Sequence, residues 1–136
     1  MRRRRSAAYL LKNVQESAAI SDAVGVADAL IQSSLLGEAV DNGPAAVFVA
    51  DENRRYIAVN RAACALLGYD REELLALRVD DVAESAPGWS ELEQGGTVVG
   101  SAVLTCRDGS RVTFRYVAGE TIVAGMPVFV SVGLRD

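Results

Sequence analysis

The chain has 136 residues, of which 50% are hydrophobic and 24% are charged, and its net charge is −4. This size and composition suit one globular domain and argue against a disordered chain. The sequence contains no histidine, so its own residues cannot form a Ser-His-Asp triad, a His-ligated haem or a His-containing zinc site. The acidic balance argues against nucleic-acid binding, which requires a basic face.

The N-terminus carries four arginines at positions 2–5, and the apolar run after them is too short for a signal peptide. No other apolar run approaches the roughly 20 residues of a membrane span. We therefore expect a cytoplasmic protein without a membrane span, in which Cys64 and Cys106 are reduced thiols. The single lysine among fourteen basic residues indicates a GC-rich bacterial genome.

Residues 6–41 lack proline and carry apolar side chains at helical spacing. Ser21 and Asp22 resemble a helix N-cap, so the segment is predicted to form one helix or two, over residues 6–20 and 22–41. Its amphipathic stripe is too short to define a coiled coil. The stripe comprises Ile20, Val24, Ala27, Ile31 and Leu35.

The turn-forming Asn42-Gly43-Pro44 ends this helical region. We place a boundary here, between an N-terminal helical segment over residues 1–42 and a globular domain over residues 43–136. Two short β-rich runs, 46–50 and 56–59, follow and predict a hairpin.

Short helices are predicted next, after the candidate N-caps Asn60 and Asp70. The last 40 residues are predicted to form three strands, over residues 97–106, 111–123 and 127–134. Asp108-Gly109 favours a type I′ turn between the first two of these strands. The order of elements predicts an α+β domain, with one antiparallel sheet and helices over one face.

Several stretches of the domain resemble a known family. They are Phe48-Val49-Ala50-Asp51, the run from Val59 to Leu74 with its Asn, Ala-Ala, Leu-Leu-Gly-Tyr and Glu-Glu-Leu, the turn at residues 107–110 and the closing residues 132–136. In this order, over residues 39–136, they resemble the PAS family of sensor domains. The resemblance implies a five-stranded antiparallel sheet of order 2-1-5-4-3 that cups a pocket beneath the helices.

The resemblance also limits the cofactor. Haem-binding members of the family use a histidine, which this chain lacks, and flavin photoreceptors of the LOV type carry a reactive cysteine in a motif that residues 78–82 do not contain. The loop at residues 82–90 lacks a cysteine for attaching another chromophore. We therefore expect neither haem nor covalent flavin photochemistry, no metal site, and no cofactor that the sequence identifies.

The alternation of side chains along each strand places mostly apolar residues on the face of the sheet that lines the pocket. Two interpretations remain open, a filled core or a cavity for a small hydrophobic ligand such as a fatty acid, with Tyr116 or Arg78 holding its polar end. The candidate pocket residues are Phe48, Ala50, Leu67, Leu74, Val82, Trp89, Ala102, Leu104, Phe114, Tyr116, Val130 and Val132.

The opposite face of the predicted sheet is too apolar to be left in water. We expect the N-terminal helix, of the same chain or of a second copy, to cover it. The candidate homodimer interface consists of Val24, Ala27, Ile31, Leu35 and Phe129.

Three functions are compatible with these features. The first is a regulatory sensor module that binds a small apolar ligand or a partner and signals through a homodimer to an effector, such as a kinase or a transcription factor, of which this chain would be the sensory fragment. The second is a ligand-free dimerisation or protein-interaction domain. An enzyme is the least favoured, because the carboxylates of Asp80, Asp81 and Glu84 lie in a polar loop without a nucleophile or a base beside them.

Overall fold

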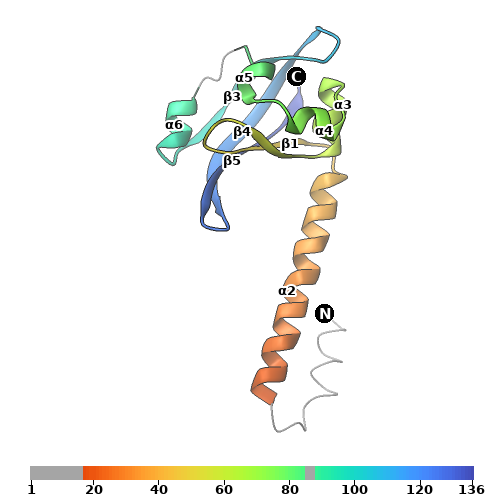
Figure 1. Ribbon diagram of the computed structural model, residues 1–136, viewed down its shortest axis with the longest axis vertical. Coiled ribbons are helices and arrows are strands. Elements are labelled where there is room, and N and C mark those ends of the chain that lie inside the picture. Colours follow the sequence, from red (N-terminus) through yellow and green to blue (C-terminus); the bar gives the residue numbers. More distant parts are fainter. Residues whose placement is uncertain (1–16, 85–87) are drawn as a thin grey trace. The chain divides into compact units, whose positions relative to one another are not determined.

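The structure is a computed structural model that describes residues 17–84 and 88–136, with side chains from residue 25 onward. These residues fall into two compact units, with the boundary between Ala39 and Val40. Most of helix α2 (Ser17–Asp41) forms the first unit, and the sheet with its short helices forms the second (Figure 1). No helix among the described residues is long and apolar enough to cross a bilayer.

Of the two alternatives for the N-terminal segment, the structure has a single helix over the part that can be compared. Helix α2 runs through Ser21 and Asp22 without interruption. Serine and aspartate each cost well under 1 kcal/mol in a helix interior, and the neighbouring alanines favour the helix. Residues 6–16 of that prediction lie outside the described residues.

The second unit is built on one antiparallel sheet, which confirms the predicted fold class. The strand order is β2-β1-β5-β4-β3, as the resemblance implied (Figure 1). The strands are β1 (Ala46–Ala50), β2 (Tyr56–Val59), β3 (Thr97–Thr105), β4 (Arg111–Val123) and β5 (Met126–Arg135).

Four short helices stand between β2 and β3: α3 (Arg61–Leu67), α4 (Arg71–Leu75), α5 (Val79–Val82) and α6 (Trp89–Glu93). Two of them begin at the predicted caps. The Asn60 side chain accepts a hydrogen bond from the Ala63 amide at 3.0 Å, and Asp70 forms a reciprocal capping box with Glu73. The largest fully buried side chains, Leu67, Leu74 and Val82, come from these helices.

The loop between β3 and β4 is not the predicted type I′ turn. Only Gly109 has a positive φ, of 86°, whereas Asp108 does not. The Asp108 carboxylate accepts hydrogen bonds from the Ser110 amide at 2.9 Å and from its hydroxyl at 2.6 Å. The Cys106 amide donates to the Ser110 carbonyl at 2.7 Å, so the loop has three residues, with glycine in the left-handed position.

A two-residue turn of the primed kind is found instead between β4 and β5. Ala124 (φ 51°) and Gly125 (φ 78°) both have positive φ, and Val123 pairs with Met126. A left-handed alanine costs about 1–2 kcal/mol, whereas asparagine is favoured there. Ala124→Asn is therefore expected to raise the free energy of unfolding by about 0.5–1 kcal/mol in chemical denaturation. An unchanged or lower value would show that the turn is not strained.

Candidate functional site

A pocket of about 90 Å³ lies between the sheet and the short helices α5 and α6. All the described residues that line it are uncharged, and those with polar side-chain groups are Tyr56, Tyr116, Ser131 and Trp89. Its lining is Phe48, Ala50, Tyr56, Val79, Ala83, Trp89, Leu92, Ala102, Leu104, Phe114, Tyr116, Ala118, Phe129, Val130 and Ser131. The pocket can hold a small, mainly apolar molecule and offers it hydrogen-bonding hydroxyl groups.

The structure brings together many of the residues that were predicted for this pocket: Phe48, Ala50, Trp89, Ala102, Leu104, Phe114, Tyr116 and Val130. Leu67, Leu74 and Val82 belong instead to the solid core, where they are at most 1% exposed. Arg78 is exposed and does not line the pocket, so it is not placed to hold the polar end of a ligand there.

The predicted facing of β5 is wrong for two residues. Val132 was expected to face the pocket but is 41% exposed, while Phe129, predicted for the dimer interface, is 6% exposed and packs on Trp89 at a ring distance of 4.9 Å. Gly133 lies close to the core on the same strand. A Cβ atom at this position would lie 2.9 Å from the Phe114 ring, so this position of β5 favours glycine.

Tyr56 is the most informative residue that sequence reasoning missed. It begins β2, lies opposite Ala50 in the neighbouring strand and packs its ring 5.5 Å from that of Phe48. Ala50 was predicted to line the pocket, and directly opposed residues of antiparallel strands face the same side of a sheet. The pairing of Tyr56 with Ala50 could therefore have revealed Tyr56. The other missed lining residues are Val79, Ala83, Leu92, Ala118, Phe129 and Ser131.

Both tyrosines of the pocket are neutral at physiological pH. Burial raises the pKa of the Tyr56 hydroxyl far above its usual value, and the carboxylates of Asp81 and Asp80 raise it further. Burial also raises the pKa of Tyr116. Within the described part of the chain, no group of three or more Cys, Asp or Glu side chains could hold a metal ion.

Arg54, in the loop between β1 and β2, contacts the helices α5 and α6 beside the pocket. It has a positive φ of 65°, which is uncommon for a residue other than glycine. Its guanidinium lies 4.7 Å from the centre of the Trp89 ring and 3.1 Å from the Asp80 carboxylate. Its carbonyl accepts a hydrogen bond from the Val79 amide at 2.8 Å. The β1–β2 loop thereby holds α5 and α6 in place over the pocket.

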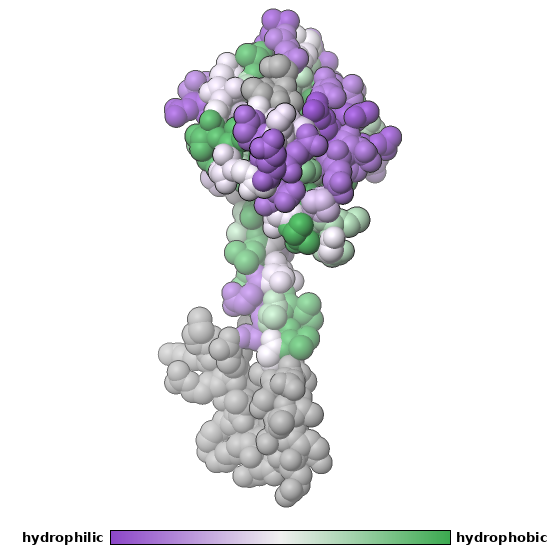
Figure 2. Space-filling model, turned by 90° about the vertical axis from the view of Figure 1, so that its left-hand side faces the viewer, coloured by the Kyte–Doolittle hydropathy of each residue, from purple (hydrophilic) through white to green (hydrophobic). Residues whose placement is uncertain are grey.

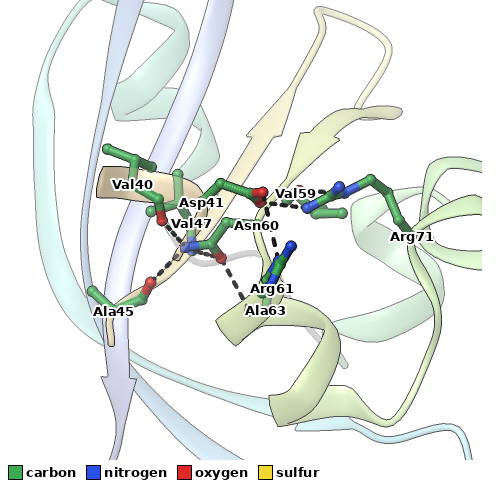
Figure 3. A network of polar contacts seen from close by, with 9 residues as sticks. All are labelled: Val40, Asp41, Ala45, Val47, Val59, Asn60, Arg61, Ala63 and Arg71. Atoms are coloured by element: carbon green, nitrogen blue, oxygen red, sulfur yellow. Dashed lines mark hydrogen bonds and ion pairs between the residues drawn. The ribbon is translucent and has the colours of Figure 1, made fainter. Parts of the chain in front are cut away.

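A second polar site surrounds Asn60, which is 4% exposed (Figure 3). Its side-chain oxygen accepts hydrogen bonds from the amides of Val47 at 2.9 Å and Ala63 at 3.0 Å. Its side-chain nitrogen donates to the carbonyls of Val40 at 2.7 Å and Ala45 at 2.8 Å. Asn60 thus caps the start of α3 and also satisfies a carbonyl in the last turn of α2.

Asp41 lies beside this network, at the end of α2. A carboxylate is unfavourable at a helix C-terminus because of the helix dipole, and two arginines compensate for it. Arg61 lies 3.8 Å from the carboxylate, and Arg71 binds it directly while donating to the Val59 carbonyl at 3.1 Å (Figure 3). The end of α2 is therefore held by charge as well as by Asn60.

The face of the sheet away from the pocket carries a row of valines. Val47, Val132, Val117 and Val99 stand opposite one another in register across β1, β5, β4 and β3. Exposure is 41% for Val132, 51% for Val117 and 76% for Val99. An apolar face of this kind is typical of an interaction surface.

Helix α2 exposes apolar side chains as well (Figure 2). Of the predicted interface, Ala27 is exposed, and Ile31 and Leu35 are 43% and 55% exposed. The neighbouring Val26, Leu30 and Leu36 are also exposed. Val24 lies in α2, but its side chain is outside the described part of the structure.

A five-stranded antiparallel sheet of this strand order with short helices over one face is the architecture of PAS domains. Residues 34–98 match the family model of the PAS domain. These residues, just under half of the chain, match the PAS domain, a sensor and signalling module.

Solved structures agree with this assignment of the fold. A PAS domain from a two-component sensor histidine kinase superposes with a TM-score of 0.72 at 16% identity, over 79% of this chain and 99% of that one. A PAS domain of an HTR-like protein from Haloarcula marismortui has a TM-score of 0.69 at 21% identity, over 80% and 95% of the two chains.

An RNA-binding light-oxygen-voltage receptor shares the fold as well. Its TM-score is 0.67 at 17% identity, over 78% of this chain and 34% of that one. No curated protein matches the sequence significantly.

Proposed function

We propose that this chain is a regulatory sensor module that binds a small molecule in the pocket and signals through a homodimer to an effector. The observation that carries the ligand-binding part is the pocket itself, whose described walls are uncharged and which contains the hydroxyl groups of Tyr56 and Tyr116. This resembles small-molecule sites, which are mostly apolar with a few polar groups that orient the ligand. The lining offers no nucleophile activated by a base, so we propose signalling without catalysis.

The homodimer part rests on two apolar surfaces. The valine row of the sheet and the exposed leucine and isoleucine residues of α2 each present apolar side chains to solvent in the single chain. Burying each such side chain stabilises an assembly by roughly 1.5–3 kcal/mol. We propose that a second copy covers them, and that an effector receives the signal through this interface.

A ligand-free dimerisation domain is the second candidate. The observation that favours it is the volume of the pocket, about 90 Å³, because most ligand pockets measure roughly 300–1,000 Å³. In this case the aromatic cup would be a packed core, and the dimer alone would carry the function.

Sedimentation of the 136-residue chain tests the dimer. Leu35→Glu places a charge in the proposed interface, so we expect the dimer to dissociate into monomers. Leu75→Glu is the matched control, because Leu75 is also an exposed leucine but lies on α4, outside both proposed surfaces. A dimer that survives Leu35→Glu, or a wild-type chain that sediments as a monomer, would contradict the proposed interface.

A further inference from the structure

We propose that the pocket takes a compact, uncharged molecule about the size of one aromatic ring, which accepts a hydrogen bond from the Tyr56 hydroxyl. This inference rests on the proposed ligand-sensing function and narrows it. It also replaces the fatty acid that was considered from the sequence.

The volume sets the size of the ligand. The pocket measures about 90 Å³, whereas an apolar cavity of roughly 150 Å³ is known to admit benzene. One ring therefore requires only a modest outward movement of side chains such as Trp89, which lies on the five-residue helix α6. A long acyl chain would require the aromatic core to open.

The aromatic walls of the pocket favour a planar ligand. Phe48 packs against Phe114 in an edge-to-face arrangement at 5.5 Å, and Phe114 stacks on Tyr116 at 5.8 Å. Trp89 and Phe129 form a further pair at 4.9 Å. Aromatic rings interact best in offset-stacked or edge-to-face geometry, and these pairs offer both faces and edges to an inserted ring.

Tyr56 supplies the polar contact. Only 6% of the residue is exposed, and it lines the pocket from β2. A ligand acceptor that reaches the hydroxyl group at this largely buried position gains a hydrogen bond that is little weakened by competing water. Because Tyr56 remains protonated, it donates, so the ligand must present an acceptor such as a carbonyl oxygen.

The charges around Tyr56 disfavour an anion. The nearest charged groups with an effect on Tyr56 are the carboxylates of Asp81 and Asp80. The Arg54 guanidinium contacts the aromatic wall at Trp89, but it is paired with Asp80 at 3.1 Å and does not line the pocket. A carboxylate ligand would therefore be desolvated without a cationic partner, which is costly.

Titration of the 136-residue chain with benzamide, benzoate and octanoate, followed by nuclear magnetic resonance, tests the proposal. We expect benzamide to bind saturably and to shift the signals of the pocket residues, and the two anions to bind at least tenfold more weakly. Tyr56→Phe is expected to weaken benzamide binding roughly five- to tenfold. Tyr69→Phe is the matched control, since Tyr69 packs against the core but does not line the pocket, and it should leave the affinity unchanged.

The outcomes separate this inference from the broader function. Benzoate or octanoate binding as tightly as benzamide in the pocket would overturn the ligand class while supporting a ligand sensor. An equal affinity of the wild-type chain and Tyr56→Phe would overturn the role of Tyr56. If none of the three probes moves the pocket signals, both the inference and ligand sensing by this pocket are wrong, and the ligand-free dimerisation domain is favoured.

Discussion

Replacing Asn60 with alanine is expected to lower the free energy of unfolding by about 3–4 kcal/mol, as measured by chemical denaturation. The side chain makes four hydrogen bonds of 2.7–3.0 Å, two as acceptor and two as donor. Alanine would leave these backbone groups without their partner in a site where water enters poorly, and each unsatisfied buried group costs about 1–3 kcal/mol. The N-cap of α3 is lost at the same time.

One further variant separates the two bonds that Asn60 accepts from the two that it donates, and a second variant serves as the control. Asn60→Asp keeps the acceptor for the amides of Val47 and Ala63 but turns an oxygen toward the carbonyls of Val40 and Ala45, so it is also expected to destabilise the domain. Asn53→Ala is the matched control on an exposed loop residue and should change stability by less than about 0.5 kcal/mol. A loss of less than about 1 kcal/mol for Asn60→Ala would contradict the structural role of the network.

Gly133→Ala is expected to destabilise the domain by about 3 kcal/mol, although it adds a single methyl group to a strand. The added Cβ would overlap the carbonyl oxygen of Arg115 on the paired strand β4 and would lie 2.9 Å from the Phe114 ring. A backbone carbonyl in the middle of a sheet cannot move away without breaking the pairing of β4 with β5. The strand or the aromatic core must therefore shift.

Gly119 provides the matched control on the same pair of strands. A Cβ atom at Gly119 would meet only the Thr97 hydroxyl, at 3.9 Å. Gly119→Ala is expected to be neutral, or to stabilise by up to about 1 kcal/mol, because alanine loses less conformational entropy on folding. Equal stability of the two alanine variants in the same denaturation experiment would refute the close approach at Gly133.

The fold could be predicted from the sequence because its signals are local. The change from helical spacing to alternation after Asn42-Gly43-Pro44, and the caps Asn60 and Asp70, are properties of neighbouring residues. The β3–β4 turn was predicted less well. Asp108-Gly109 fits two turn types, and the bonds from Ser110 to the Asp108 carboxylate decide between them.

The site could be predicted only in part, because its geometry depends on packing between distant strands. Alternation alone does not say which residues of β5 face inward, and Val132 was predicted to do so. The structure places Ser131 and Gly133 there, since Phe48 and Phe114 already occupy the space above them. The second role of Asn60, at the end of α2, and the contact of Arg54 with Trp89 likewise join segments that are far apart in the sequence.

We propose that the pocket and the homodimer interface are coupled, so that a ligand bound in the pocket changes the dissociation constant of the dimer. The most direct test is the dimer dissociation constant of the 136-residue chain, measured by sedimentation with and without saturating benzamide. Coupling between two sites is reciprocal and is typically at least about fivefold. We predict a change of that size in the wild-type chain and a smaller one in Tyr56→Phe at the same benzamide concentration. The same dissociation constant with and without bound benzamide would contradict the claim.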